Sequence, residues 1–224
     1  MCGRFALTAD PRTLKEIFHL REQMEFRPRY NIAPRDRILV VRRASGNEAI
    51  LMQWQLIPAW AESRQIKYST FNAVSEMAAN KPTFRGACRA GRRCLIPASG
   101  FYEWRDEKGG KQPYFFRIRD QEPFAMGGLW ERWEGDGEIL DSCTILTVPA
   151  NDAVRPIHAK QRMPFILERK DYEGWLDPER PSAEAMELCR PYPAEKTVVY
   201  PVTRQVNRAG IESPSFIEPL ITKP

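Results

Sequence analysis

Short stretches rich in apolar residues, bounded by polar and turn residues, recur along the chain and predict β-strands. The clearest pair is residues 37–43 and 48–54, which flank Ala44-Ser45-Gly46-Asn47 and therefore predict a hairpin. The same pattern predicts a second hairpin, residues 101–107 and 113–119 around Lys108-Gly109-Gly110, and further strands over residues 124–133, 139–148, 164–167 and 197–202.

Helical spacing of apolar residues is less common. Residues 13–24 carry Leu14, Ile17 and Leu20 among charged residues, which predicts an amphipathic helix. Residues 170–176 and 182–189 predict two shorter helices, the second capped by a serine after a proline. Many short strands with few helices predict an α+β fold, built on a curved, largely antiparallel sheet or a barrel-like core.

Length and composition limit the class of protein. The 224 residues suit one domain spanning 1–224, with 42% hydrophobic residues. We find no apolar run near the ~18 residues that cross a membrane, and no apolar signal segment at the N-terminus, so we expect a cytoplasmic protein without a membrane partner. Five cysteines without Cys-x-x-Cys spacing argue against a disulfide framework or a zinc site, so no metal is expected. The four internal ones are predicted to be packing residues: Cys88, Cys94, Cys143 and Cys189.

The net charge of +5 favours a polyanionic partner. Arginines gather in two places, at residues 27–37 and 85–93. Such clusters fit either phosphate binding or a solvated basic face, and the sequence alone leaves both interpretations open.

The second residue carries unusual chemistry. Cys2 is small enough for Met1 to be removed, which would leave an amine and a thiol on adjacent carbons. A terminal amine has a pKa of ~7.7–8.0 and a thiol of ~8.5. The amine can therefore condense with an aldehyde, and the thiol can close on the same carbon to form a thiazolidine. The alternative is that Cys2 is an inert small hydrophobic residue.

Proton transfer would need an acid or base near Cys2. His158 lies in a loop after a predicted strand and has an ordinary pKa of ~6.5, whereas His19 lies in the predicted helix and is interpreted as structural or solvated. Glu103 lies between Tyr102 and Trp104, and such neighbours raise the pKa of a carboxyl group. Strand alternation offers another interpretation, in which Glu103 simply faces water.

Polar and aromatic residues recur in short motifs from the first residue to near the last. They include Met1-Cys2-Gly3-Arg4-Phe5-Ala6-Leu7-Thr8, Arg29-Tyr30-Asn31-Ile32-Ala33-Pro34, Trp54-Gln55-Leu56-Ile57-Pro58-Ala59-Trp60, Phe71-Asn72-Ala73, Ser99-Gly100-Phe101-Tyr102-Glu103-Trp104, Ile157-His158, Arg162-Met163-Pro164 and Val206-Asn207. In this order they resemble the SRAP family, the SOS-response-associated peptidase domain of abasic-site-processing proteins. The resemblance implies a barrel-like fold, which agrees with the fold predicted from the strands.

The resemblance implies a function and a set of site residues. It implies covalent cross-linking to abasic sites in single-stranded DNA, through a thiazolidine that Cys2 forms after Met1 is removed. Glu103 and His158 would transfer protons, and Asn72 would orient the amine or the sugar. The partner would be DNA, met by a monomer in the cytoplasm or at the nucleoid, and no cofactor is implied. We expect DNA contacts from Arg4, Pro58, Trp60, Thr147, Lys160 and Arg162.

Two departures from the family pattern concern DNA contacts. Val74 stands where the family usually has an arginine, and Ala159-Lys160-Gln161 lengthens the loop between the histidine and Arg162. Gln55 also replaces a common glycine. Other functions remain open at this point: a cysteine peptidase acting through Cys2 and His158, a lyase side reaction, or a non-catalytic single-stranded DNA-binding module.

Overall fold

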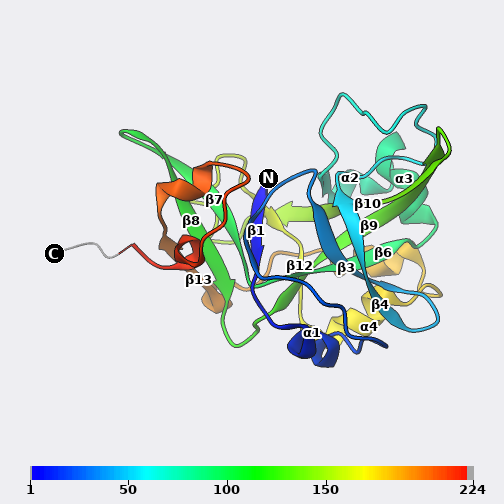
Figure 1. The fold of residues 1–224 in the computed structure, drawn as a ribbon, viewed down its shortest axis with the longest axis horizontal. Coiled ribbons are helices and arrows are strands. Elements are labelled where there is room, and N and C mark those ends of the chain that lie inside the picture. The colour runs from blue at the N-terminus through cyan, green and yellow to red at the C-terminus, as the bar shows by residue number, and fades with distance from the viewer. Residues whose placement is uncertain (1, 221–224) are drawn as a thin grey trace.

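Five strands close into a barrel in the computed structural model, which describes residues 2–220 (Figure 1). Around the barrel the strands are β3 (Arg37–Arg43), β4 (Asn47–Trp54), β10 (Glu138–Pro149), β9 (Phe124–Gly135) and β6 (Arg93–Ala98). Each strand pairs with the next and β6 pairs back with β3; of these five pairs, only β4–β10 is parallel. The predicted α+β fold with a curved, largely antiparallel sheet is confirmed.

Three short strands extend the barrel sheet. On β10, β5 (Asn72–Val74) pairs in parallel and β11 (Arg162–Pro164) pairs antiparallel, while β12 (Ile166–Leu167) pairs with β9. The C-terminal half of β10 therefore lies between two segments that are far apart in the sequence, β5 on one edge and β11 on the other.

A second, five-stranded sheet packs beside the barrel. Its order is β13 (Thr197–Pro201), β8 (Gly110–Ile118), β7 (Gly100–Glu107), β1 (Arg4–Leu7) and β2 (Arg29–Ile32), with all pairs antiparallel. Only Ser99 separates β6 from β7, so the chain passes directly from barrel to sheet. Gly100 permits this passage, because a Cβ there would lie 2.1 Å from the Phe115 ring.

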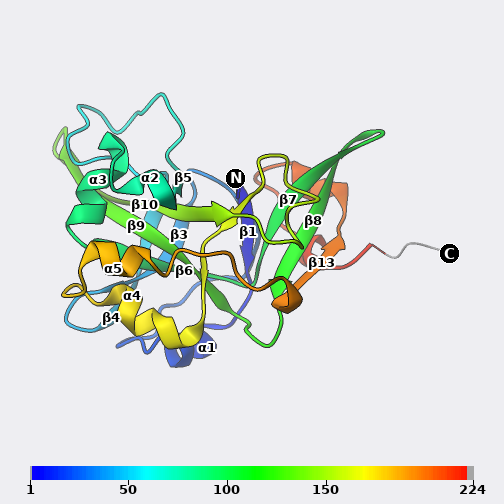
Figure 2. The same cartoon turned by 180° about the vertical axis from the view of Figure 1, so that it is seen from behind.

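Short helices surround the two sheets. They are α1 (Pro11–Ile17), α2 (Ser75–Ala78), α3 (Pro82–Arg89), α4 (Tyr172–Leu176) and α5 (Ser182–Met186), with 3-10 turns η1 (Arg169–Asp171), η2 (Ala194–Lys196), η3 (Arg204–Asn207) and η4 (Pro214–Ile217). Figure 2 shows α3, α4 and α5 on the side of the barrel away from β8 and β13. Among the described residues, no helix is long and apolar enough to cross a bilayer.

Two helix predictions need correction. The helix predicted over residues 13–24 is only α1: it starts after Asp10, whose carboxylate accepts the backbone N–H of Thr13, and the chain leaves helical geometry at His19, with φ of 50°. Ser182 does not cap α5, because its hydroxyl donates to the carbonyl of Cys88 instead.

Aromatic side chains fill the space between barrel and sheet. Trp54 is fully buried, its indole N–H donates to the carbonyl of Phe71 at 2.8 Å, and Phe5 of β1 packs edge-on against it. Cys88, Cys94 and Cys143 are buried free thiols, as their apolar sequence neighbours predict. This core attaches β1, and with it the N-terminal residues, to the barrel.

Candidate active site

Pairing between β1 and β7 brings the start of the chain to the predicted acid. Arg4 lies opposite Tyr102, and continuing the same register places Gly3 opposite Glu103. Cys2 and Glu103 are close enough for the Glu103 carboxylate to raise the pKa of the Cys2 thiol. The fold therefore assembles a nucleophile and an acid from the N-terminus and from a strand near the middle of the chain.

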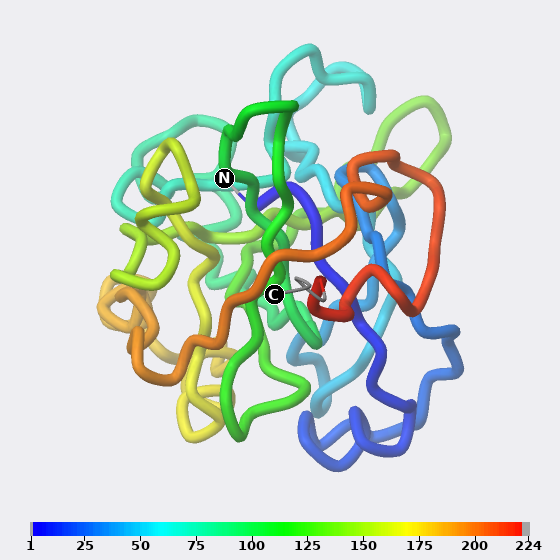
Figure 3. The backbone as a smooth tube through the Cα atoms, turned by 90° about the vertical axis from the view of Figure 1, so that its left-hand side faces the viewer, coloured from blue at the N-terminus to red at the C-terminus, as the bar shows by residue number. Residues whose placement is uncertain are grey.

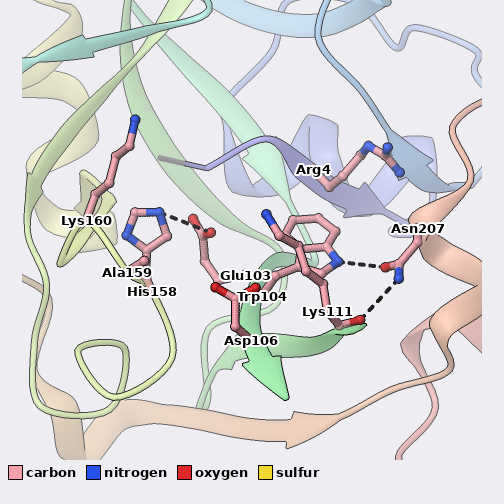
Figure 4. A pocket seen from close by; sticks show the side chains of 9 residues that line it. All are labelled: Arg4, Glu103, Trp104, Asp106, Lys111, His158, Ala159, Lys160 and Asn207. Atoms are coloured by element: carbon pink, nitrogen blue, oxygen red, sulfur yellow. Dashed lines mark hydrogen bonds and ion pairs between the residues drawn. The ribbon is translucent and has the colours of Figure 1, made fainter. Parts of the chain in front are cut away.

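The barrel supplies the other two candidates. Asn72 is the first residue of β5 and pairs with Ile145 of β10. The side-chain amide of Asn72 donates to the carbonyl of Cys2 at 2.7 Å. His158 lies in the loop between β10 and β11, and its Nε2 is 3.4 Å from Oε2 of Glu103 (Figure 4). The four predicted catalytic residues thus lie together at the junction of the two sheets.

Glu103 is the strongest candidate for an acid. Its side chain is 3% exposed, and burial raises the pKa of its carboxyl group to about 8. The group is therefore mostly protonated at neutral pH. Its Oε1 atom is buried and, among the described residues, has no hydrogen-bond partner, as is also true of Oδ1 of Asn72. A bound substrate with polar groups would satisfy both atoms.

His158 is held in one orientation and in one protonation state. Its Nδ1 accepts the backbone N–H of Arg162 at 3.2 Å, so the proton of the neutral ring is assigned to Nε2, which faces Glu103. Burial, together with the nearby positive charge of Lys160, lowers the pKa of His158 to about 4. The ordinary pKa expected from the sequence is therefore wrong for this environment, and at pH 7 a neutral His158 faces the Glu103 carboxyl group.

Cys2 is fully buried, and this determines the state of its thiol. Burial and the Glu103 carboxylate raise the pKa of the thiol, which donates to the carbonyl of Arg4 at 3.6 Å. The Arg4 guanidinium is engaged elsewhere, because it donates to Oδ1 of Asn31 at 2.6 Å and to the carbonyl of Val206. The thiol is accordingly protonated at neutral pH. The predicted removal of Met1 lies outside the described residues.

A cavity of about 470 Å³ opens over Glu103 and His158 (Figure 4). Its lining includes Arg4, Glu103 and His158 together with three residues whose role the sequence does not predict, Trp104, Lys111 and Asn207. The Trp104 indole donates to Oδ1 of Asn207 at 2.7 Å, which fixes the ring at the edge of the cavity. Asn207 belongs to the sequence motif Val206-Asn207, but the motif does not indicate a role for it.

The predicted DNA-contact residues fall into two groups. Lys160 is exposed and lines the cavity, and Trp60 is 62% exposed. Pro58 and Thr147 are buried, and the Thr147 hydroxyl donates to the carbonyl of Ala73, so neither presents a surface to DNA in this structure.

Arg162, also predicted to contact DNA, is already engaged within the protein. Its two terminal nitrogens each lie 2.8 Å from an oxygen of Glu76, and one of them also donates to the carbonyl of Thr147. The pair lowers the pKa of Glu76 to about 2. Arg162 therefore ties β11 to α2 in this structure.

Among residues 2–220, no group of three or more His, Cys, Asp or Glu side chains could hold a metal ion.

Solved structures of other bacterial proteins share this fold. A protein from Bacteroides thetaiotaomicron superposes with a TM-score of 0.89 at 26% identity, covering 97% of this chain and 99% of that one. A protein from Bordetella bronchiseptica gives a TM-score of 0.80 at 30% identity, covering 90% and 100%. The barrel with an attached five-stranded sheet is thus an arrangement found in other bacterial proteins.

Sequence comparison then identifies the family. The abasic site processing protein YoqW of Bacillus subtilis (strain 168) is 36% identical over 97% of this chain and 99% of its own length. The abasic site processing protein HMCES of Gallus gallus is 32% identical over 98% of this chain and 78% of its own length. The profile of the SOS response associated peptidase (SRAP) family matches residues 1–209. The chain belongs to the SRAP family, and the resemblance read from its motifs is confirmed.

Proposed function

We propose that this protein captures abasic sites in DNA by covalent attachment to Cys2. The observation that carries the proposal is the meeting of Cys2, Asn72, Glu103 and His158, of which Glu103 and His158 line a cavity. The names of YoqW and HMCES, abasic site processing proteins, agree with it. An abasic deoxyribose opens to an aldehyde, which is the electrophile that a terminal amino-thiol takes.

Two bonds form and one water leaves in the proposed reaction. The Cys2 amine adds to the aldehyde carbon, and Glu103, protonated at neutral pH, gives its proton to the resulting hydroxyl, which departs as water. The Cys2 sulfur then bonds to the iminium carbon, and the thiol proton returns to the Glu103 carboxylate. One aldehyde and one amino-thiol thus give one thiazolidine and one water. Asn72 holds Cys2 in place, and His158 orients Glu103.

Several finer features belong to the same proposal. A single-stranded substrate is favoured, because a sugar within an intact duplex could not reach a buried N-terminal residue. The iminium carbon also permits β-elimination, which would give a lyase side activity. We place the protein in the DNA damage response, as a one-domain monomer in the cytoplasm or at the nucleoid.

A cysteine peptidase is the alternative. It would need a thiolate paired with an imidazole that accepts its proton. Here burial raises the pKa of the Cys2 thiol, and both nitrogens of His158 face other groups, the backbone N–H of Arg162 and the Glu103 carboxyl. The geometry therefore supports aldehyde capture better than peptide cleavage.

A chain extended by Gly-Ser before Cys2 tests the function directly. We expect the normal protein to lack Met1 by intact mass and to form a denaturant-resistant adduct with a single strand that uracil glycosylase has made abasic. The extended chain should form no such adduct, because its Cys2 nitrogen is an amide. Full adduct formation by the extended chain would contradict the proposal. A peptidase, in contrast, would keep its cleavage activity in the extended chain, because it does not use the terminal amine.

Binding to an unmodified single strand should depend on salt. The cavity places Lys111 and Lys160 at its edge, where they can meet phosphates. At ~0.7 per phosphate, these two contacts contribute about 1.4 to the magnitude of the log Kd–log salt slope. Fluorescence anisotropy across a salt series measures this slope, and a value near zero would remove nucleic acid from the proposed function.

A further inference from the structure

A second cavity, of about 510 Å³, lies beside residues 55–71, the segment that joins β4 to β5. Its polar lining consists of three cationic and three amide side chains, namely Arg35, Arg64, Lys67, Gln53, Gln55 and Gln65. None of these residues is acidic, and none takes part in the reaction proposed for Cys2. The lining is suited to an anion.

Arg35 is held in this cavity by an uncharged partner. Its Nε donates to Oε1 of Gln55 at 3.1 Å, and its backbone N–H donates to the carbonyl of Trp54 at 2.9 Å. Gln55 is only 7% exposed, so its amide is a fixed acceptor. Arg35 also adopts a φ of 78°, in the left-handed region that non-glycine residues rarely occupy. The contacts fix the direction of the guanidinium but leave its charge uncompensated by Gln55.

The other two cations lie on the segment itself. Arg64 is 2.8 Å from Glu138, but both side chains are more than half exposed, so an incoming phosphate can compete for the arginine. Lys67 lies three residues further along and is exposed. Trp60 and Tyr68, 62% and 48% exposed, belong to the same segment. Cations interleaved with exposed aromatic rings are typical of surfaces that bind single-stranded nucleic acid.

The segment also leads to the candidate active site. It ends at Phe71, and the next residue, Asn72, donates to the carbonyl of Cys2. In Figures 1 and 2 the cyan segment projects from the upper side of the molecule, toward which the start of β1 also points, and Figure 3 shows the segment at the top as well. A strand attached at Cys2 can therefore continue along the segment toward Arg35.

We propose that the second cavity binds the phosphodiester backbone of the single strand flanking the captured sugar. The inference rests on the proposed function, because it extends the path of the same substrate strand. Trp60 and Tyr68 would stack on its bases, while Arg35, Arg64 and Lys67 would meet its phosphates. The cavity would thus add length-dependent affinity without touching the reacting carbon.

The test compares salt slopes for an unmodified strand of about ten nucleotides, within the ~4–16 that single-strand sites cover. The triple variant Arg35→Gln, Arg64→Gln, Lys67→Gln should lower the slope magnitude by about 2, at ~0.7 for each lost phosphate contact. Arg12→Gln is the matched control, since Arg12 also forms an exposed pair, with Glu16, and belongs to α1. Its slope should equal that of the wild-type protein.

A charge-neutral variant separates positioning from net charge. Gln55→Ala keeps all three cations but frees Arg35, and should lower the slope magnitude by about 0.7, one contact. Triple-variant and Gln55→Ala slopes equal to the Arg12→Gln slope would overturn the inference. Capture of a short abasic strand that lacks flanks should be unchanged in the triple variant. Failure of the wild-type protein to capture an abasic strand of about ten nucleotides would instead count against the proposed function.

Discussion

Replacement of Cys2 by alanine should abolish the heat-stable adduct with abasic single strands. Without Sγ, the second bond to the aldehyde carbon cannot form, and the imine that the remaining amine makes is reversible in water. We expect the adduct surviving denaturation to fall at least a hundredfold, roughly the effect of losing a covalent catalytic group. Denaturing gel electrophoresis after a heating step measures the surviving fraction.

Two further variants make this result specific. Cys189→Ala removes a free, half-buried thiol elsewhere in the chain and should leave the yield unchanged. Cys2→Ser keeps a nucleophilic atom in place and should give an adduct that reverses faster on heating. An adduct from Cys2→Ala equal to wild type in amount and heat stability would show that the thiazolidine assignment is wrong.

Replacement of Glu103 by glutamine should slow adduct formation by roughly 10²–10⁴-fold, the usual loss when a general acid is removed. Glutamine preserves shape and can still accept the Nε2–H of His158, but it has no proton to give. The wild-type rate should rise as the Cys2 amine loses its proton, with a pKa of ~7.7–8.0, and fall again as Glu103 ionises above about pH 8. Single-turnover rates across pH should show that the variant lacks the alkaline fall.

The stability of the same variant provides its folding control. Between pH 4.5 and about 8, an unfolded chain ionises Glu103 while the folded protein keeps it protonated, so wild-type stability decreases as pH rises through this range. Glu103→Gln removes the decrease and should be more stable at pH 8, by about 5 kcal/mol at most. A slow variant that melts higher than wild type would separate lost catalysis from misfolding.

His158→Ala should behave differently from Glu103→Gln. Because His158 is neutral and faces the Glu103 carboxyl group, its loss should alter adduct reversal and ring opening more than final yield. Time courses of formation and of transfer to a competing strand distinguish the two variants. If both variants match wild type in every assay, Glu103 and His158 have only structural roles.

Strands that flank a clear turn signal could be predicted from the sequence. The hairpin of β3 and β4 is confirmed, since its pattern and its Ser45-Gly46 turn agree. In contrast, β6 was missed because Pro97 lies within it, and a proline inside an apolar run argues against a strand. The helix after Asp10 was predicted too long because apolar residues keep helical spacing beyond the point where the backbone turns at His19.

The candidate site was predicted in chemistry but not in geometry. The identity of Cys2 and the aromatic neighbours of Glu103 are visible in the sequence, and the raised pKa of Glu103 agrees with that prediction. The state of His158 depends on a backbone N–H four residues later and on a cation from the lengthened loop, so only the folded chain reveals it. The buried position of Thr147 likewise follows from its place on β10 between two neighbouring strands.

The position of β1 has a mechanical consequence. Cys2 precedes β1 by a single residue, and β1 lies between β7 and β2 with its Phe5 packed on Trp54. A strand of DNA attached at Cys2 would pull β1 along its length, so that hydrogen bonds on both sides resist together in shear. Force from a motor protein moving along the DNA would therefore meet a strand that is paired on both edges, and release by unfolding would require β1 to separate from β7 and from β2.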